Sequence, residues 1–178
     1  MKVITISGKA QAGKDTTARL LKDKLTNSQR NVMILHYADL LKWQAATMFG
    51  WDGKKDEAGR TLLQHLGTEI VRKKNPHYWV TYLIETLKVY DDLWDYVLIP
   101  DARFENEIIP MKNYFDSIAI RIESIPFDSG LTEEQKNHPS ETALDDFKFD
   151  YYVHNDRTLE GLGAEVDKLI QKWGELDL

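Results

Sequence analysis

The sequence predicts a single α/β domain, residues 1–178, built around a central, mostly parallel, five-stranded sheet. Strand-like runs of apolar and β-branched residues alternate with helix-like segments along the whole chain. Hydrophobic residues make up 42% of the 178 residues and charged residues 29%, which is enough apolar material for a core and too much for a disordered chain. The length fits one ordinary domain.

The predicted strands are short runs rich in valine, isoleucine and aromatic residues. They cover Val3–Ser7, Val32–Tyr37, Tyr96–Ile99, Ile118–Ile122 and Tyr151–Val153. Ligands of such sheets bind at the carboxyl ends of the strands. We therefore expect the site among the loops that begin at Gly8, Asp39, Asp101, Ile125 and Asn155.

Helical spacing of apolar residues fills the segments between the strands. The predicted helices run from Lys14 to about Thr26, from Asp39 to Phe49, from about Asp56 to Lys74, across Val80–Leu87, after Asn106, and from Thr158 to Trp173. Gly50 and Pro76 end two of these helices. Pro110 is expected in the first turn of the helix after Asn106, and the stretch 126–146 is polar and loop-like.

Charge and residue types narrow the classes of function. A net charge of −6 does not favour a nucleic acid polymer as partner. The chain has no cysteine, which excludes disulfides and thiolate metal sites. The start lacks a secretory signal and no apolar run approaches about 18 residues, so we expect a cytoplasmic protein without membrane contact. Apolar helix faces are compatible with a homodimer.

Residues 8–14 read GKAQAGK, which fits the G-x-x-x-x-G-K pattern of a phosphate-binding loop, here between a predicted strand and a predicted helix. Backbone amides in such a loop surround phosphate oxygens, and the lysine can bridge the β- and γ-phosphates. The residues expected to bind ATP are Gly8, Ala10, Ala12, Gly13, Lys14, Asp15 and Thr16. The alternative is a tight strand-to-helix turn with a solvated Lys14.

The loop departs from the common pattern at its last position. Asp15 replaces the usual serine or threonine, and Thr16 follows one residue later. Either side chain is a candidate ligand for Mg²⁺, directly or through water.

The segment GKAQAGKDTTA resembles the phosphate loop of the deoxynucleoside monophosphate kinases of bacteriophages and related bacterial proteins. Further blocks resemble that family in order: YADLLK, residues 49–79, IPDARFENE, HPSE and NDRTLE. The resemblance implies a P-loop kinase three-layer sandwich with a small lid at about 126–146 and an acceptor-binding helical region at about 39–80. It also implies phosphoryl transfer from ATP, with Mg²⁺, to a nucleoside monophosphate, which yields the diphosphate.

Four polar residues recur every four positions: Arg60, Gln64, Thr68 and Arg72. On one helix they form a slowly drifting stripe. Guanidinium groups match phosphate oxygens, so the stripe is a candidate acceptor site, and the resemblance favours binding, more for Arg60 than for Arg72. The alternative is a solvated face in which Glu57 and Glu69 pair with the arginines.

Asp101 follows a buried strand, the usual position of a carboxylate that holds Mg²⁺ or its water in P-loop enzymes. Arg103 would then project between donor and acceptor and offset charge on the transferring group. With Lys14, these two residues are the catalytic candidates. The alternative is an Asp101–Arg103 pair that only orders a loop.

Several further residues are candidates for binding the acceptor or ATP, and some of them have a structural alternative. Asp39 and Lys42 lie where the acceptor is expected, although Asp39 is equally well explained as a helix cap. Trp79, with Trp43, Trp51 and Tyr78, could stack on a base, whereas aromatic residues at helical spacing usually belong to the core. In the architecture of the family, Asn155 would lie beside the adenine ring. His138 is interpreted as a loop-ordering residue rather than a metal ligand.

The leading hypothesis is a P-loop kinase of (deoxy)nucleoside monophosphates that uses ATP and Mg²⁺. Its partners are then small-molecule nucleotides. A phosphomevalonate-type kinase and a non-catalytic nucleotide-binding domain remain as alternatives.

Overall fold

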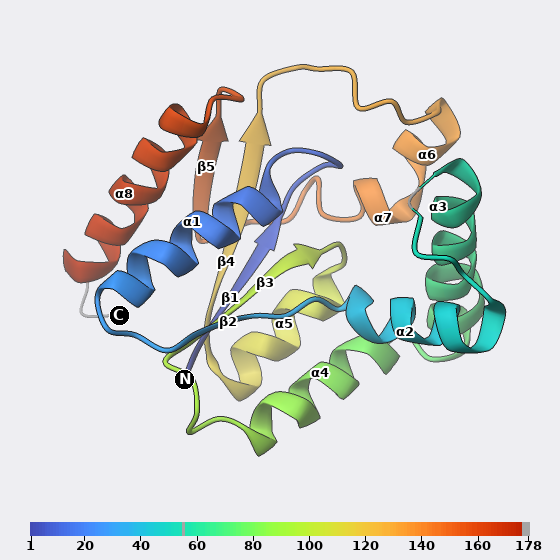
Figure 1. Cartoon of the computed structure of the whole chain (residues 1–178), viewed down its shortest axis with the longest axis horizontal. Coiled ribbons are helices and arrows are strands. Elements are labelled where there is room, and N and C mark those ends of the chain that lie inside the picture. The colour runs from blue at the N-terminus through green and yellow to red at the C-terminus, as the bar shows by residue number, and fades with distance from the viewer. Residues whose placement is uncertain (55, 176–178) are drawn as a thin grey trace.

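The computed structural model describes residues 1–54 and 56–175. Its five strands are β1 (Lys2–Ser7), β2 (Val32–Ile34), β3 (Tyr96–Ala102), β4 (Asp116–Ser124) and β5 (Tyr151–Asn155). They form one sheet in the order β2-β3-β1-β4-β5, and all four neighbouring pairs are parallel (Figure 1). The predicted α/β fold with a parallel five-stranded sheet is confirmed. Because β1 is central, the loop after it emerges between the ends of β3 and β4.

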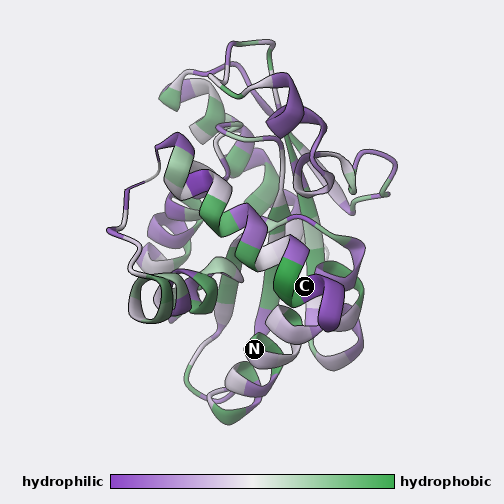
Figure 2. Ribbon diagram, turned by 90° about the vertical axis from the view of Figure 1, so that its right-hand side faces the viewer, coloured by the Kyte–Doolittle hydropathy of each residue, from purple (hydrophilic) through white to green (hydrophobic). Residues whose placement is uncertain are grey.

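Helices cover both faces of the sheet, so the molecule has three layers. Helices α1 (Lys14–Asn27) and α8 (Leu159–Glu175) pack on one face, and α4 (Tyr78–Val89) and α5 (Glu105–Tyr114) pack on the other. Strands are mostly hydrophobic, whereas the helices mix hydrophobic and hydrophilic residues (Figure 2). This is the pattern of a sheet that is buried on both faces.

The remaining helices lie beyond the carboxyl ends of the strands, where they surround the expected site (Figure 1). They are α2 (Ala38–Phe49), α3 (Glu57–Gln64), η1 (His65–Arg72), α6 (Glu133–Asn137) and α7 (Pro139–Thr142). Within the described parts of the chain, no helix is both long and apolar enough to cross a membrane.

The helix expected from Asp56 to Lys74 is present, but its second half has wider turns than predicted. Asp56 caps α3, since its side chain accepts a hydrogen bond from the backbone N–H of Gly59 at 2.8 Å. From His65 to Arg72 the backbone is a π-helix, a form that occurs frequently at functional sites.

Three local expectations were wrong. Strand β2 stops at Ile34 rather than Tyr37, because the Tyr37 amide turns to the side chain of Asp101 at 3.0 Å. Asp39 does not cap α2, which begins one residue earlier, at Ala38; its carboxylate accepts the N–H of His36 at 3.0 Å. The stretch 126–146 is not all loop, since it carries α6 and α7.

Pro110 lies inside α5 rather than in its first turn, which corrects a fourth expectation. The helix starts at Glu105, before Asn106, because the Glu107 carboxylate reaches back to the N–H of Phe104 at 3.0 Å. That capping interaction places the proline in the second half of the helix, where its missing N–H removes one helical hydrogen bond.

Thr158 caps α8, and we predict a measurable loss of stability without it. Its hydroxyl accepts the N–H of Gly161 at 3.0 Å and donates to Asp156 at 2.8 Å. Thr158→Ala should lower the free energy of unfolding by about 1 kcal/mol in urea denaturation, the usual cost of losing an N-cap. Thr158→Ser keeps the hydroxyl and should stay close to wild type. Equal stability of the alanine variant would show that the cap contributes nothing.

Candidate active site

The phosphate loop is built as the sequence predicts, and Asn155 holds it in place. Gly13 adopts φ +101°, and a Cβ at this position would lie 2.5 Å from the side-chain nitrogen of Asn155, so only glycine fits there. The same nitrogen donates to the carbonyl of Ala12 at 2.8 Å. Asn155 is buried, and its amide therefore ties the end of β5 to the loop.

Lys14 turns back over its own loop rather than into solvent. Its Nζ donates to the carbonyls of Gly8 and Lys9, each at 2.8 Å, and the residue is only 7% exposed. Burial lowers the pKa of Lys14 to about 7, with the nearby Arg103 as a second cause. The alternative, a tight turn with Lys14 in solvent, is therefore wrong, because Lys14 is buried and bonded to its own loop.

We predict that Lys14 lowers stability near neutral pH. In the unfolded chain Lys14 keeps its ordinary pKa of 10.5, whereas the folded value is about 7. As pH falls between these values, only the unfolded state gains the proton, so the penalty on folding grows and is complete below about pH 7. Lys14→Met should therefore raise the free energy of unfolding more at pH 7 than at about pH 9.5 in urea titrations.

Lys22→Met, the same change on the outer side of α1, is the matched control and should show no such dependence on pH. A Lys14→Met variant whose stability gain does not depend on pH would contradict the lowered pKa.

Asp15 is linked to Asp39 of α2 through His36, which the sequence analysis missed. Ring nitrogens of His36 lie 3.1 Å from Asp15 Oδ1 and 3.4 Å from Asp39 Oδ2. The hydrogen bond to Asp15 raises the pKa of His36. Thr16 follows in the first turn of α1. Within residues 1–54 and 56–175 no three His, Asp or Glu side chains form a ready metal cage; Mg²⁺ ordinarily keeps several waters and uses only one or two carboxylates.

Asp101 serves the start of α2 and does not pair with Arg103. Its two carboxylate oxygens accept the N–H groups of Tyr37 at 3.0 Å and Ala38 at 2.9 Å. Burial raises the pKa of Asp101, while His36 and the two amides act in the opposite direction. The alternative in which Asp101 and Arg103 form a loop-ordering pair is therefore wrong.

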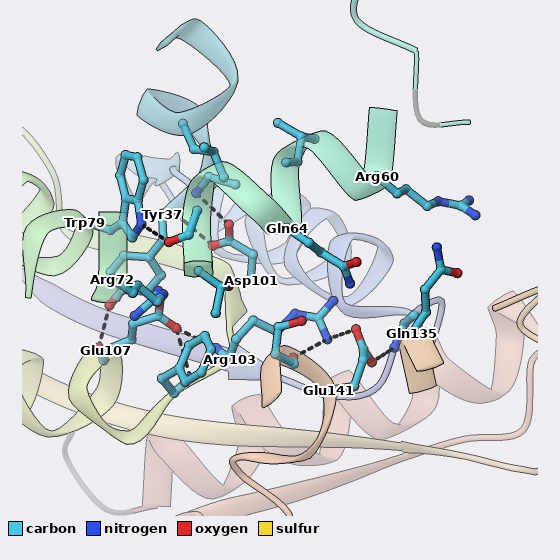
Figure 3. A pocket seen from close by; sticks show the side chains of 18 of the residues that line it. Tyr37, Arg60, Gln64, Arg72, Trp79, Asp101, Arg103, Glu107, Gln135 and Glu141 are labelled. Carbon is cyan, nitrogen blue, oxygen red and sulfur yellow. Dashed lines mark hydrogen bonds and ion pairs between the residues drawn. The ribbon is translucent and has the colours of Figure 1, made fainter. Parts of the chain in front are cut away.

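A cavity of about 310 Å³ lies beside the phosphate loop (Figure 3). All four residues of the predicted stripe line it, together with Trp79, Asp101 and Arg103. Four residues make slightly more than one turn of an α-helix, so side chains four apart shift steadily to one side around the axis. In the wider turns of η1, four residues make less than one turn, so the shift runs in the opposite direction. The stripe thus stays on the cavity side from Arg60 to Arg72.

Other predicted acceptor residues lie outside the lining of this cavity. Lys42 pairs with Asp39 at 3.1 Å, and neither lines it. Trp43 is 59% exposed. The indole N–H of Trp51 donates to the carbonyl of Lys54, and the Tyr78 hydroxyl accepts a hydrogen bond from the side chain of Gln44. Trp79 itself is buried, and its indole N–H donates to the carbonyl of Gly67 at 3.2 Å.

Arg72 is fixed by a buried carboxylate that the sequence analysis did not select. Glu107, 1% exposed, forms an ion pair with Arg72 and accepts the N–H of Arg103 at 2.6 Å. The Arg72 guanidinium also lies 4.1 Å from the centre of the Phe104 ring. Glu69 instead lies 3.9 Å from His138, so the alternative of a solvated face with Glu69 pairing Arg72 is wrong. The sequence offers no capping-box signal for Glu107, because Phe104 has no side-chain oxygen at the N-cap position.

We predict that removing this buried charge is costly. Glu107→Gln should lower the free energy of unfolding by about 3 kcal/mol or more, because Arg72 would remain buried without a counter-charge. Glu105→Gln, on the exposed side of the same helix, should change stability by less than about 0.5 kcal/mol. Thermal and urea unfolding of both variants test this, and equal effects would contradict a special role of Glu107.

Arg103 reaches the phosphate loop and binds a residue of α7 there. Its Nη1 donates to the Glu141 carboxylate at 2.7 Å and more weakly to the carbonyls of Ser140 at 3.3 Å and Gly8 at 3.4 Å. Figure 3 shows the Arg103 and Glu141 side chains side by side at the edge of the cavity. His138 orders this segment as predicted, because its ring accepts the N–H of Ser140 at 3.2 Å.

Comparison with known proteins shows the family of this chain. A family model described as deoxynucleotide monophosphate kinase matches residues 26–166, well over half of the chain. The chain belongs to the deoxynucleotide monophosphate kinase family. The matched region begins after the phosphate loop, so the geometry of that loop is an observation independent of the family match.

Solved structures show the same fold at low sequence identity. The dephospho-CoA kinase of Campylobacter jejuni has a TM-score of 0.56 at 12% identity over 96% of this chain and 97% of that chain. The Mycobacterium tuberculosis APS kinase in complex with AMPPNP and APS has a TM-score of 0.55 at 14% identity over 96% and 97%. The Aquifex aeolicus shikimate kinase has a TM-score of 0.54 at 17% identity over 97% of each chain.

These neighbours confirm the P-loop kinase sandwich as the fold. Membership of the deoxynucleotide monophosphate kinase family supports a phosphotransferase. None of the curated protein sequences compared with the chain matches it.

Proposed function

We propose that the protein transfers the γ-phosphoryl group of ATP to the phosphate of a (deoxy)nucleoside monophosphate and so forms the diphosphate. One observation carries this proposal: an arginine-bearing cavity opens directly beside the phosphate loop, and Ala10 and Arg103 lie on its lining. A donor phosphate on the loop and an acceptor phosphate in the cavity would then be neighbours, and bringing them together supplies most of the catalysis.

On the donor side, the backbone amides from Ala10 to Thr16 would surround the phosphates, with Lys14 as their cation. The unusual burial of Lys14 suits this role, because a phosphate beside it would favour the charged form. Asn155 would act on ATP by holding the loop rather than by a side-chain contact, since its amide already bonds Ala12.

Mg²⁺ would be held by Asp15 or Thr16 together with phosphate oxygens, and by Asp101 through water. When bound, it would neutralise charge on the phosphates during transfer. The two amides on Asp101 leave its oxygens with further lone pairs for such a water.

On the acceptor side, the helical region 39–80 would bind the nucleotide. Arg72 is held ready by Glu107 and Phe104, whereas among the described residues no ion pair engages Arg60. We expect Arg72 to grip the acceptor phosphate and Arg60 to adjust to the ligand. No general base is needed, since an acceptor phosphate is already a nucleophile at neutral pH.

The segment 126–146 would act as a lid over the transferring phosphate and exclude water. It already reaches the phosphate loop at Lys9 and Ala10. The partners would then be small-molecule nucleotides, in the cytoplasm.

The decisive test is ADP formation from Mg-ATP with each of the four deoxynucleoside monophosphates, their ribose counterparts, phosphomevalonate and no acceptor. We expect consumption of ATP only with one or more nucleoside monophosphates. Lys14→Met should lower kcat by about 100-fold or more, because charge in the transition state loses its cation, and Lys22→Met should be as active as wild type. Turnover with phosphomevalonate alone, or comparable activity of Lys14→Met, would overturn the proposal.

A further inference from the structure

A carboxylate of the lid segment occupies a backbone amide of the phosphate loop. Oε2 of Glu141 accepts the N–H of Ala10 at 2.8 Å, and Oε1 accepts from Arg103 at 2.7 Å. The Glu141 side chain is 8% exposed, so it lies deep between the two elements. One anionic group thus joins an amide that the proposed function assigns to the donor phosphate with an arginine that the sequence predicts beside the transferring group.

The position of Glu141 is where the transferred group would pass. Besides the acceptor cavity, a second cavity of about 610 Å³ lies between the phosphate loop and the lid segment. Ala10 and Glu141 line both cavities. The Glu141 carboxylate therefore stands at the junction of the two cavities.

A carboxylate and a phosphate are alternative occupants of such a position. Both are anions that accept bonds from a backbone N–H and from a guanidinium, and two like charges at one position repel each other strongly when water is excluded. Glu141 also contributes to the electrostatic environment of Lys14. A donor phosphate that reaches the Ala10 amide must displace it.

We propose that Glu141 is an internal substitute for phosphate that keeps Arg103 paired until a donor nucleotide displaces it. This inference rests on the proposed function. Displacement would remove the counter-charge of Arg103 and free the guanidinium for the acceptor phosphate. Donor binding would thereby strengthen acceptor binding, and by linkage the acceptor would strengthen binding of the donor by the same factor. Glu141 is in this sense a positioning residue that acts through Arg103.

Other contacts hold the lid segment to the phosphate loop and to β4 without involving the Ala10 amide or Arg103. Lys9 binds the Asp145 carboxylate at 2.6 Å, and Arg121 binds it at 3.0 Å. Lys9 also donates to the backbone carbonyl of Glu141 at 2.8 Å. Loss of Asp145 would loosen the segment without freeing the Ala10 amide or Arg103.

The first experiment measures binding of the non-hydrolysable ATP analogue AMPPNP, with Mg²⁺, by calorimetry. Glu141→Gln should bind the analogue about tenfold more tightly than wild type, because the competing charge is gone. Glu134→Gln, a matched charge loss on the exposed side of α6, should change affinity by less than about twofold. Unchanged or weaker binding by Glu141→Gln, with a native circular dichroism spectrum, would overturn the proposal.

The second experiment measures coupling. In wild type, saturating AMPPNP should strengthen binding of the deoxynucleoside monophosphates that the enzyme uses, whereas in Glu141→Gln the ratio of affinities should fall towards one, because Arg103 is already released. An equal ratio in both proteins would overturn the release of Arg103.

Failure of the proposed function would look different. If wild type binds no monophosphate, the coupling fails together with the proposed acceptor, while tighter AMPPNP binding by Glu141→Gln would still establish Glu141 as a substitute for phosphate.

Discussion

The cavity beside the phosphate loop depends on one buried carboxylate. Glu107 binds Arg72 of η1, accepts the amides that follow β3 and, through its backbone carbonyl, accepts the Tyr37 hydroxyl at 2.5 Å. Three parts of the chain are thereby held together at the end of the sheet. A charge buried this deeply is tolerated only with such partners, so the positions of Arg72 and Arg103 are strongly constrained.

Three cations around the phosphate loop and its cavity are paired with carboxylates. Arg72 faces Glu107, Arg103 faces Glu141 and Lys9 faces Asp145. Lys14 instead rests on backbone carbonyls. The pairs differ in burial, since the Arg72 and Glu107 side chains are 13% and 2% exposed, whereas those of Arg103 and Glu141 are 25% and 8% exposed. Under the proposed function, the Arg72–Glu107 pair would stay intact, whereas the Arg103–Glu141 pair would open when a donor phosphate displaces Glu141.

Much of the fold follows from local patterns. Alternating apolar runs predicted all five strands, and the spacing of Arg60, Gln64, Thr68 and Arg72 predicted a stripe on one side of a helix. Errors arose where side chains distant in sequence decide a boundary. Asp101 ends β2 and starts α2 from 64 residues away, and Glu107 sets the start of α5 so that Pro110 falls inside it. No local pattern signals the π-helical turns that keep the stripe facing the cavity.

By itself, the sequence determined the alternation of strands and main helices along the chain, the phosphate loop and the stripe Arg60, Gln64, Thr68 and Arg72 on the cavity lining, because periodicity, glycine and charge act over a few neighbouring positions. Only the tertiary structure decided which carboxylate each arginine meets. Arg72 and Glu107 are 35 residues apart, and Arg103 and Glu141 are 38 apart. Such pairs form only after parallel strands bring their carboxyl ends to one edge, where burial from solvent then selects the partners.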